Sequence, residues 1–191
     1  MADLPNVTER QAKYFASLRG SLESATGKSL QAWVAIARSC PETAHRARLK
    51  WFKDTHGLLQ NRASFVISEA FGSTMSWRDA DGLIDALWTD DASRAIFETL
   101  DNAAQALPGT VRTARKGYTA WSRTFQYAAV KPLKGGGAML GLAVALERDA
   151  RLEAPKNESW SERLKARTRL NAPGEVDARI GELLKEAWEK A

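Results

Sequence analysis

Four positively charged residues at alternate positions are the clearest chemical feature of this sequence. Arg163, Lys165, Arg167 and Arg169 are separated by apolar or small residues. Successive side chains of a β-strand point to opposite faces, so this spacing predicts a strand with one basic and one apolar face. A row of guanidinium and ammonium groups can neutralise phosphates, which is the chemistry of nucleic-acid binding.

Further basic and aromatic residues precede this stretch. Arg123 and Lys131 would extend the basic face if their strands are its neighbours, and Trp121, Tyr127 and Trp160 are interleaved with them. Cations and aromatic rings on a sheet bind single strands by neutralising the backbone and stacking on bases. Two alternatives stay open: the aromatics face the core, or they line a concave pocket for a small ligand.

The charge distribution concentrates positive charge in the same part of the chain. The whole chain of 191 residues carries a net charge of +5. Residues 109–172 alone contain thirteen basic and five acidic side chains, a net charge of +8. Such a block can attract phosphates or acidic partners, although it is also typical of a solvated sheet face.

A phosphate-binding loop is the first alternative chemistry, because Gly27, Lys28 and Ser29 resemble the end of a Walker motif. That motif needs a glycine five positions earlier, where Leu22 stands, and a strand before the loop, where a helix is expected. We therefore interpret Ser29 as a helix cap.

Metal, thiol and carboxylate chemistry have equally little support. His45 and His56 are the only histidines, and Cys40 is the only cysteine, so ligand density for zinc is low and no base for a thiolate can be named. A cluster of five aspartates, Asp79, Asp81, Asp85, Asp90 and Asp91, fits two helix N-termini. We predict no catalytic residue, cofactor or metal site, and favour a protein without enzymatic activity while leaving an enzyme open.

Hydrophobic periodicity places helices in the first part of the chain. Apolar residues recur at helical spacing in four segments, which end at Gly27, Cys40-Pro41, Gly57 and Gly72. We expect a flexible N-terminus at 1–8, a four-helix module at 9–72 and a linker at 73–78.

The remainder, residues 79–191, is predicted to be an α+β module. Two helices near 79–87 and 90–107 precede five strands near 111–116, 118–123, 125–131, 138–146 and 163–170, and a helix follows from about 175. The large residues of 138–146 should pack a core, and the small face could let a helix approach. The expected fold class is α+β, a small helical bundle followed by a mostly antiparallel sheet flanked by helices.

Two family resemblances match this division. Tyr14-Phe15, Thr26-Gly27-Lys28-Ser29-Leu30 with Trp33, Lys50-Trp51 and His56-Gly57-Leu58 resemble the helical domain-of-unknown-function family 4287 over about residues 10–72. Segments 83–88, 125–128, 140–142, 159–160 and 170–177 make the rest similar to the α+β domain-of-unknown-function family 5655. The resemblance implies a domain order and no activity.

These patterns predict a binding module, with nucleic acid as the leading ligand and the basic sheet face as its site. A protein-interaction or regulatory module acting through the helical half, or a small-ligand-binding domain, is the alternative. The longest apolar stretch has nine residues, residues 138–146, and no targeting segment is recognisable. We therefore expect a cytoplasmic protein that does not bind membranes.

Overall fold

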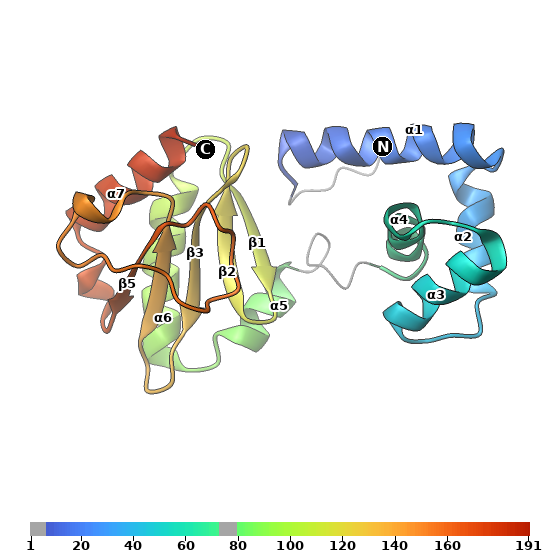
Figure 1. Cartoon of the computed structure of the whole chain (residues 1–191). Helices are drawn as coiled ribbons and strands as arrows, with labels where there is room; N and C mark the ends of the chain where they lie inside the picture. The colour runs from blue at the N-terminus through green and yellow to red at the C-terminus, as the bar shows by residue number, and fades with distance from the viewer. Residues whose placement is uncertain (1–6, 73–79) are drawn as a thin grey trace. The chain divides into compact units, whose positions relative to one another are not determined.

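The chain folds as two compact units, which a computed structural model describes at residues 7–72 and 80–191 (Figure 1). We call residues 9–72 the helical unit and residues 80–191 the sheet unit. The predicted linker at 73–78 and most of the predicted flexible N-terminus lie outside the described residues. None of the helices in the described ranges is long and apolar enough to cross a membrane.

The helical unit consists of four helices, α1 (Glu9–Thr26), α2 (Leu30–Arg38), α3 (His45–His56) and α4 (Gln60–Phe71). Two of its helix boundaries are formed by the residues that the sequence predicts. Ser29 Oγ accepts a hydrogen bond from the amide of Ala32 at 3.3 Å, and Gly57 ends α3 with a φ of 65°. A side chain at that φ would be strained, which explains the glycine.

One core holds the helical unit together. It is built from buried side chains of all four helices and of Leu58: Leu22, Trp33, Ala37, Phe52, Leu58, Ala63, Val66 and Ile67. Trp33 also donates its indole N–H to Thr26 Oγ1 at 2.9 Å, which ties α2 to the end of α1.

The sheet unit contains a five-stranded antiparallel sheet in the order β1-β2-β3-β4-β5. Its strands are β1 (Val111–Arg115), β2 (Tyr118–Ser122), β3 (Gln126–Pro132), β4 (Ala138–Leu142) and β5 (Ala166–Leu170). The helices α5 (Ala80–Leu87) and α6 (Asp91–Gln105) precede the sheet, and α7 (Ala178–Glu189) follows it. The predicted α+β class with an antiparallel sheet is confirmed.

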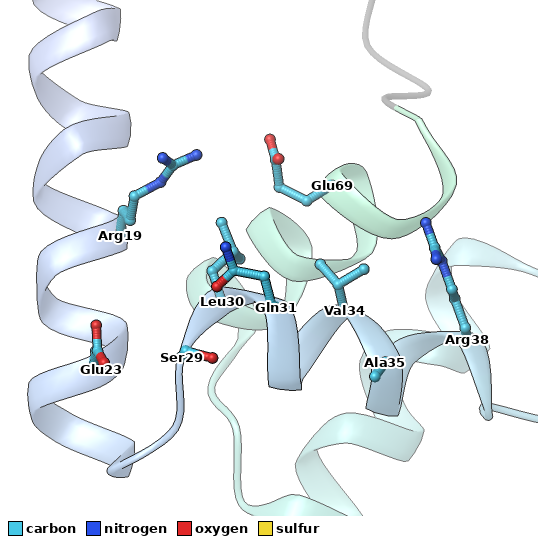
Figure 2. Close-up of a pocket in the computed structure, with 9 residues that line it drawn as sticks. All are labelled: Arg19, Glu23, Ser29, Leu30, Gln31, Val34, Ala35, Arg38 and Glu69. Carbon is cyan, nitrogen blue, oxygen red and sulfur yellow. The ribbon is translucent and has the colours of Figure 1, made fainter. Parts of the chain in front are cut away.

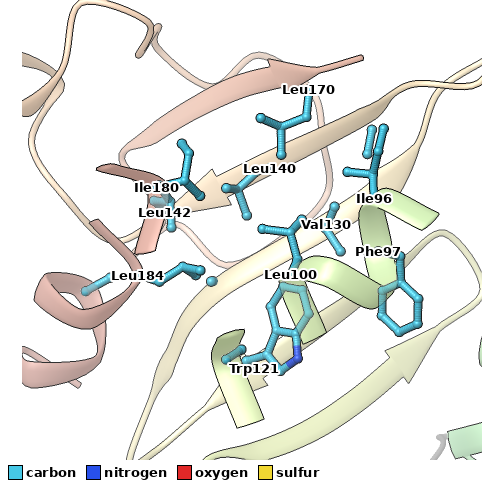
Figure 3. Close-up of a cluster of buried hydrophobic side chains, with 14 of the residues drawn as sticks. Ile96, Phe97, Leu100, Trp121, Val130, Leu140, Leu142, Leu170, Ile180 and Leu184 are labelled. Atoms are coloured by element: carbon cyan, nitrogen blue, oxygen red, sulfur yellow. The ribbon is translucent and has the colours of Figure 1, made fainter. Parts of the chain in front are cut away.

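The main core lies between one face of the sheet and the helices α6 and α7. Figure 3 shows side chains of α6 and α7 meeting those of β2 to β5 in this layer. Cross-strand partners share a face, and the inner face contains the rows Trp121–Ala128–Leu142–Ala166 and Thr119–Val130–Leu140–Thr168. We call this the inner face and the opposite one the outer face.

The outer face is covered in part by the long connection between β4 and β5, residues 143–165, which crosses it in Figure 1. Its Trp160 packs against Gly141, where an added Cβ would lie 2.7 Å from the indole Cζ2. The predicted small face therefore receives an indole ring and not a helix.

Two predicted strands are shorter than expected, because the chain turns where the apolar pattern continues. β4 ends at Leu142 and is followed by a 3₁₀ turn at Leu146–Arg148, while β5 begins only at Ala166. Before β5 a turn is closed by the hydrogen bond from the Leu164 amide to the Ser161 carbonyl at 3.0 Å.

Candidate nucleic-acid interface

The six basic residues predicted for the interface divide into three groups in the structure. Arg167 is buried, Lys131 and Arg169 lie on the outer face, and Arg123, Arg163 and Lys165 surround the end of the sheet where β3 begins. Each group has a different electrostatic environment.

Arg167 is only 7% exposed and is held by two carboxylates. Its guanidinium forms ion pairs with Glu158 and, at 3.0 Å between Nη2 and Oε1, with Glu153. Glu153 also forms an isolated backbone bridge with Arg167, so the connection seals this side chain against the sheet. The expectation that Arg167 points into solvent is wrong, and its charge is neutralised inside the protein.

The pKa of the Glu158 carboxyl is lowered in this pair. Burial alone would raise the pKa of the carboxyl, but hydrogen bonds from Arg167 and from the Lys156 amide outweigh it and hold the pKa below its usual value. Neither Glu153 nor Glu158 was identified from sequence, since acidic residues in a polar loop carry no spacing that points to one strand position.

Lys131 and Arg169 lie in one row across the outer face. Lys131 pairs with Met139 across β3 and β4, and Met139 pairs with Arg169 across β4 and β5. Lys131 Nζ is 5.7 Å from the Trp160 ring centroid, and Arg169 Nε donates to an amide oxygen, Asn171 Oδ1, at 2.8 Å. Arg169 is exposed, while Lys131 is half-buried beside the Trp160 ring.

Two members of the third group line a small cavity of about 240 Å³ at the end of the sheet. Arg163, Lys165 and Lys190 contribute cations to its lining, beside Phe125 and Gln126. The Arg163 guanidinium lies over the Phe125 ring, 3.8 Å from its centroid, and Gln126 Nε2 is buried without a hydrogen-bond partner.

Arg123 repeats the arrangement of a guanidinium on an aromatic ring. Its guanidinium carbon lies 4.3 Å from the ring centroid of Trp188, a residue of α7. Contacts of this kind hold the guanidinium against a ring, so that less conformational freedom remains to be lost on binding.

Several arginines of the sheet unit are instead neutralised by carboxylates. Arg94 Nη2 lies 2.7 Å from Asp85 Oδ1, and Arg151 binds both Asp149 and Asp177. Hydrogen bonds from Arg151 lower the pKa of Asp149 to about 2. Ion pairs also hold Arg112, Arg148 and Arg179.

The remaining cations of the proposed interface are different. Within residues 7–72 and 80–191, no ion pair joins a carboxylate to any of the five that remain after Arg167 is set aside, namely Arg123, Lys131, Arg163, Lys165 and Arg169. Five cations without a carboxylate partner therefore lie on the outer face and at the adjoining end of the sheet.

Comparison with known families identifies the two units. Residues 84–191, more than half of the chain, match the model described as Domain of unknown function (DUF5655). The chain belongs to this family. Residues 14–71 match a second model, Domain of unknown function (DUF4287), so both resemblances and their order are confirmed. No curated protein and no solved structure matches the chain.

Two of the three predicted pocket aromatics lie inside the core of the DUF5655 domain. Trp121 and Tyr127 are fully buried, and the Trp121 indole donates to Asp101 Oδ1 at 2.7 Å. Trp121 pairs with Ala128 while Ser122 pairs with Gln126, which leaves Tyr127 as the extra residue of a β-bulge. These two rings cannot line a surface pocket together with Trp160, which lies on the outer face.

The helical unit that precedes the DUF5655 domain has a different kind of hollow, shown in Figure 2. It measures about 520 Å³, with Leu30 and Val34 of α2 below and Arg19 of α1 and Glu69 of α4 projecting above them. Because both signs of charge line it, it does not extend the positive surface. Within the described ranges, no group of three His, Cys, Asp or Glu side chains is placed to hold a metal ion.

Proposed function

We propose that the sheet unit is a binding module for single-stranded nucleic acid. The unit contacts the strand through the five cations without a carboxylate partner. The observation that carries the proposal is the contrast between these five and the neutralised arginines of the same unit. A cation already paired to a carboxylate gains little by meeting a phosphate, whereas an unpaired one releases a condensed counterion from the strand.

The neighbouring aromatic rings support nucleic acid over other polyanions. The guanidinium carbons of Arg163 and Arg123 lie over the rings of Phe125 and Trp188, 3.8 and 4.3 Å from the ring centroids. The second side of a guanidinium plane held in this way can stack on an unpaired base, while its N–H groups bind phosphate. Lys165, which directly precedes β5, and Arg169 within β5 are four residues apart, roughly 13 Å in an extended chain.

The experiment measures fluorescence polarisation of a labelled oligothymidylate of about 20 nucleotides between about 50 and 200 mM salt. Each phosphate contact contributes about 0.7 to the log–log slope for a single strand. We expect Lys165→Ala to lower the slope by about 0.7, and Lys165→Ala with Arg169→Ala to lower it by about 1.4.

Lys185→Ala is the matched control. Lys185 is exposed on α7, which packs on the inner face, and it is joined to no carboxylate within the described residues. Lys185→Ala removes one positive charge, as Lys165→Ala does, and it should leave the slope unchanged. Absence of binding at low salt, or equal effects of Lys165→Ala and Lys185→Ala, would refute the proposed interface.

A further inference from the structure

A groove lined by aromatic rings lies in the helical unit, between α1, α3 and α4. Its volume is about 500 Å³, within the range of small-molecule sites. Six large apolar side chains line it, namely Tyr14, Phe15, Leu18, Phe65, Ile67 and Phe71. All its lining residues belong to the helical unit, whereas the cations proposed to bind nucleic acid belong to the sheet unit.

Some apolar side chains of this groove are buried and others are exposed to water. Phe65 and Ile67 are nearly inaccessible, and the Phe65 ring stacks on Phe15 with centroids 6.2 Å apart. Tyr14 and Phe71 are 50% and 40% exposed. These two are among only four large hydrophobic side chains that are exposed in the described residues, so apolar surface open to water is concentrated here.

Arg48 gives the polar part of the groove lining a positive charge. Arg48 lies over the Phe71 ring with its guanidinium carbon 3.5 Å from the centroid, and its Nε donates to the Glu42 carbonyl at 2.8 Å. These contacts fix the guanidinium while its two terminal nitrogens make no ion pair within the described residues. Arginine binds carboxylates through such a pair of parallel donors.

A second feature adds positive potential at the same place. Thr43 and His45 line the groove at the start of α3. The cap residue there is Ala44, whose side chain cannot accept a hydrogen bond from the first amides. Thr43 lies one residue before this cap position. The helix therefore presents uncapped N–H groups, which favour an anion. No carboxylate lines the groove to occupy them.

We propose that this groove binds a small carboxylate with an aromatic or branched apolar body. The apolar body would cover Phe65, Ile67 and the exposed rings of Tyr14 and Phe71, and the carboxylate would meet Arg48. A neutral apolar molecule would leave the guanidinium without a partner, and a highly charged one would leave the rings exposed.

The test uses the full chain and a fluorescent aromatic anion, 8-anilinonaphthalene-1-sulfonate, whose displacement is followed. 4-Phenylbutyrate is compared with 4-phenylbutan-1-ol, which has the same body without the charge. We expect the acid to displace the probe at about tenfold lower concentration than the alcohol, the factor that one charge-assisted hydrogen bond supplies.

Arg48→Met keeps an unbranched apolar stem and removes the charge of the side chain. It should abolish the preference for the acid and leave the affinity for the alcohol unchanged. Arg46→Met is the control, because Arg46 is an exposed residue of the same helix that does not line the groove. Ser64→Leu places bulk in the groove from α4, and it should weaken both ligands even if Arg48→Met does not fold.

Equal displacement by acid and alcohol, or equal behaviour of Arg48→Met and Arg46→Met, would overturn the proposal. A concentration-dependent dimer would also overturn the proposal if Phe71→Ala abolishes it and phenylbutyrate does not. The groove would then be an interface between copies of the chain. Oligonucleotide binding should be unaffected by Ser64→Leu, which separates this site from the proposed nucleic-acid interface.

Discussion

Gly141 in the middle of β4 is the position where adding one methyl group should have the clearest cost. An ideal Cβ on Gly141 would lie 2.7, 2.8 and 3.0 Å from Cζ2, Cε2 and Cη2 of Trp160. Carbon atoms in van der Waals contact are about 3.5–4.0 Å apart, so in Gly141→Ala the indole must move away from the outer face. The ring is rigid, so the movement has to be taken up by the connection that carries it.

Two opposing terms decide the magnitude. Replacing glycine by alanine restricts the unfolded chain, which alone would stabilise the fold by about 0.4–1 kcal/mol. Overpacking of a well-filled site costs about 1–3 kcal/mol. We therefore expect Gly141→Ala to lower the free energy of unfolding of the sheet unit by about 1–2 kcal/mol.

Calorimetric or urea unfolding would measure this change, and Gly181→Ala is the matched control. Gly181 lies inside α7, where an added Cβ meets no heavy atom within 4 Å. The same substitution there should stabilise the sheet unit by about 0.5–1 kcal/mol, the difference in helix propensity.

The double variant Gly141→Ala with Trp160→Leu identifies the cause. If the indole is the obstacle, the added methyl group should cost little once leucine replaces it, and the two changes should be strongly non-additive. The reasoning is refuted if Gly141→Ala stabilises the protein as much as Gly181→Ala does, or if its cost is unchanged with leucine at 160.

Two further predictions concern pH. Arg167 holds the pKa of Glu158 below its usual value, so the stability that this pair adds is present above about pH 4.5 and is lost as pH falls through the lowered pKa. Glu158→Gln should lower the free energy of unfolding at neutral pH and reduce the further loss of stability in acid. Urea unfolding at pH 7 and pH 3 measures both effects, and an unchanged dependence of stability on pH would contradict the prediction. Burial raises the pKa of Tyr127 to about 12, against the effect of its hydrogen bond with Thr110. The unfolded chain releases this proton near pH 10, so stability should fall between about pH 10 and 12; Tyr127→Phe should lose less stability over that interval, and identical alkaline profiles would exclude Tyr127 as the cause.

Much of the local structure could be predicted from the sequence, because it depends on neighbouring residues. Ser29 and Asp90 cap their helices through side-chain oxygens, at 3.3 and 2.9 Å from the amides they accept from. Gly57 ends α3, and alternation correctly identified five strands. The interface prediction also placed Arg163, Lys165 and Arg169 correctly as exposed residues, since their neighbours Leu164 and Leu170 are buried.

Only the tertiary structure decided which charges remain unpaired. Arg167 has the same alternation as Arg169, yet the connection over the outer face brings Glu153 and Glu158 onto it, 14 and 9 residues earlier in the chain. The β-bulge at Tyr127 likewise brings its ring into the core, a position that simple alternation along β3 does not predict. Alternation along a strand assigns a residue to a face, but burial and charge pairing depend on which distant segment covers that face, and no local pattern contains that information.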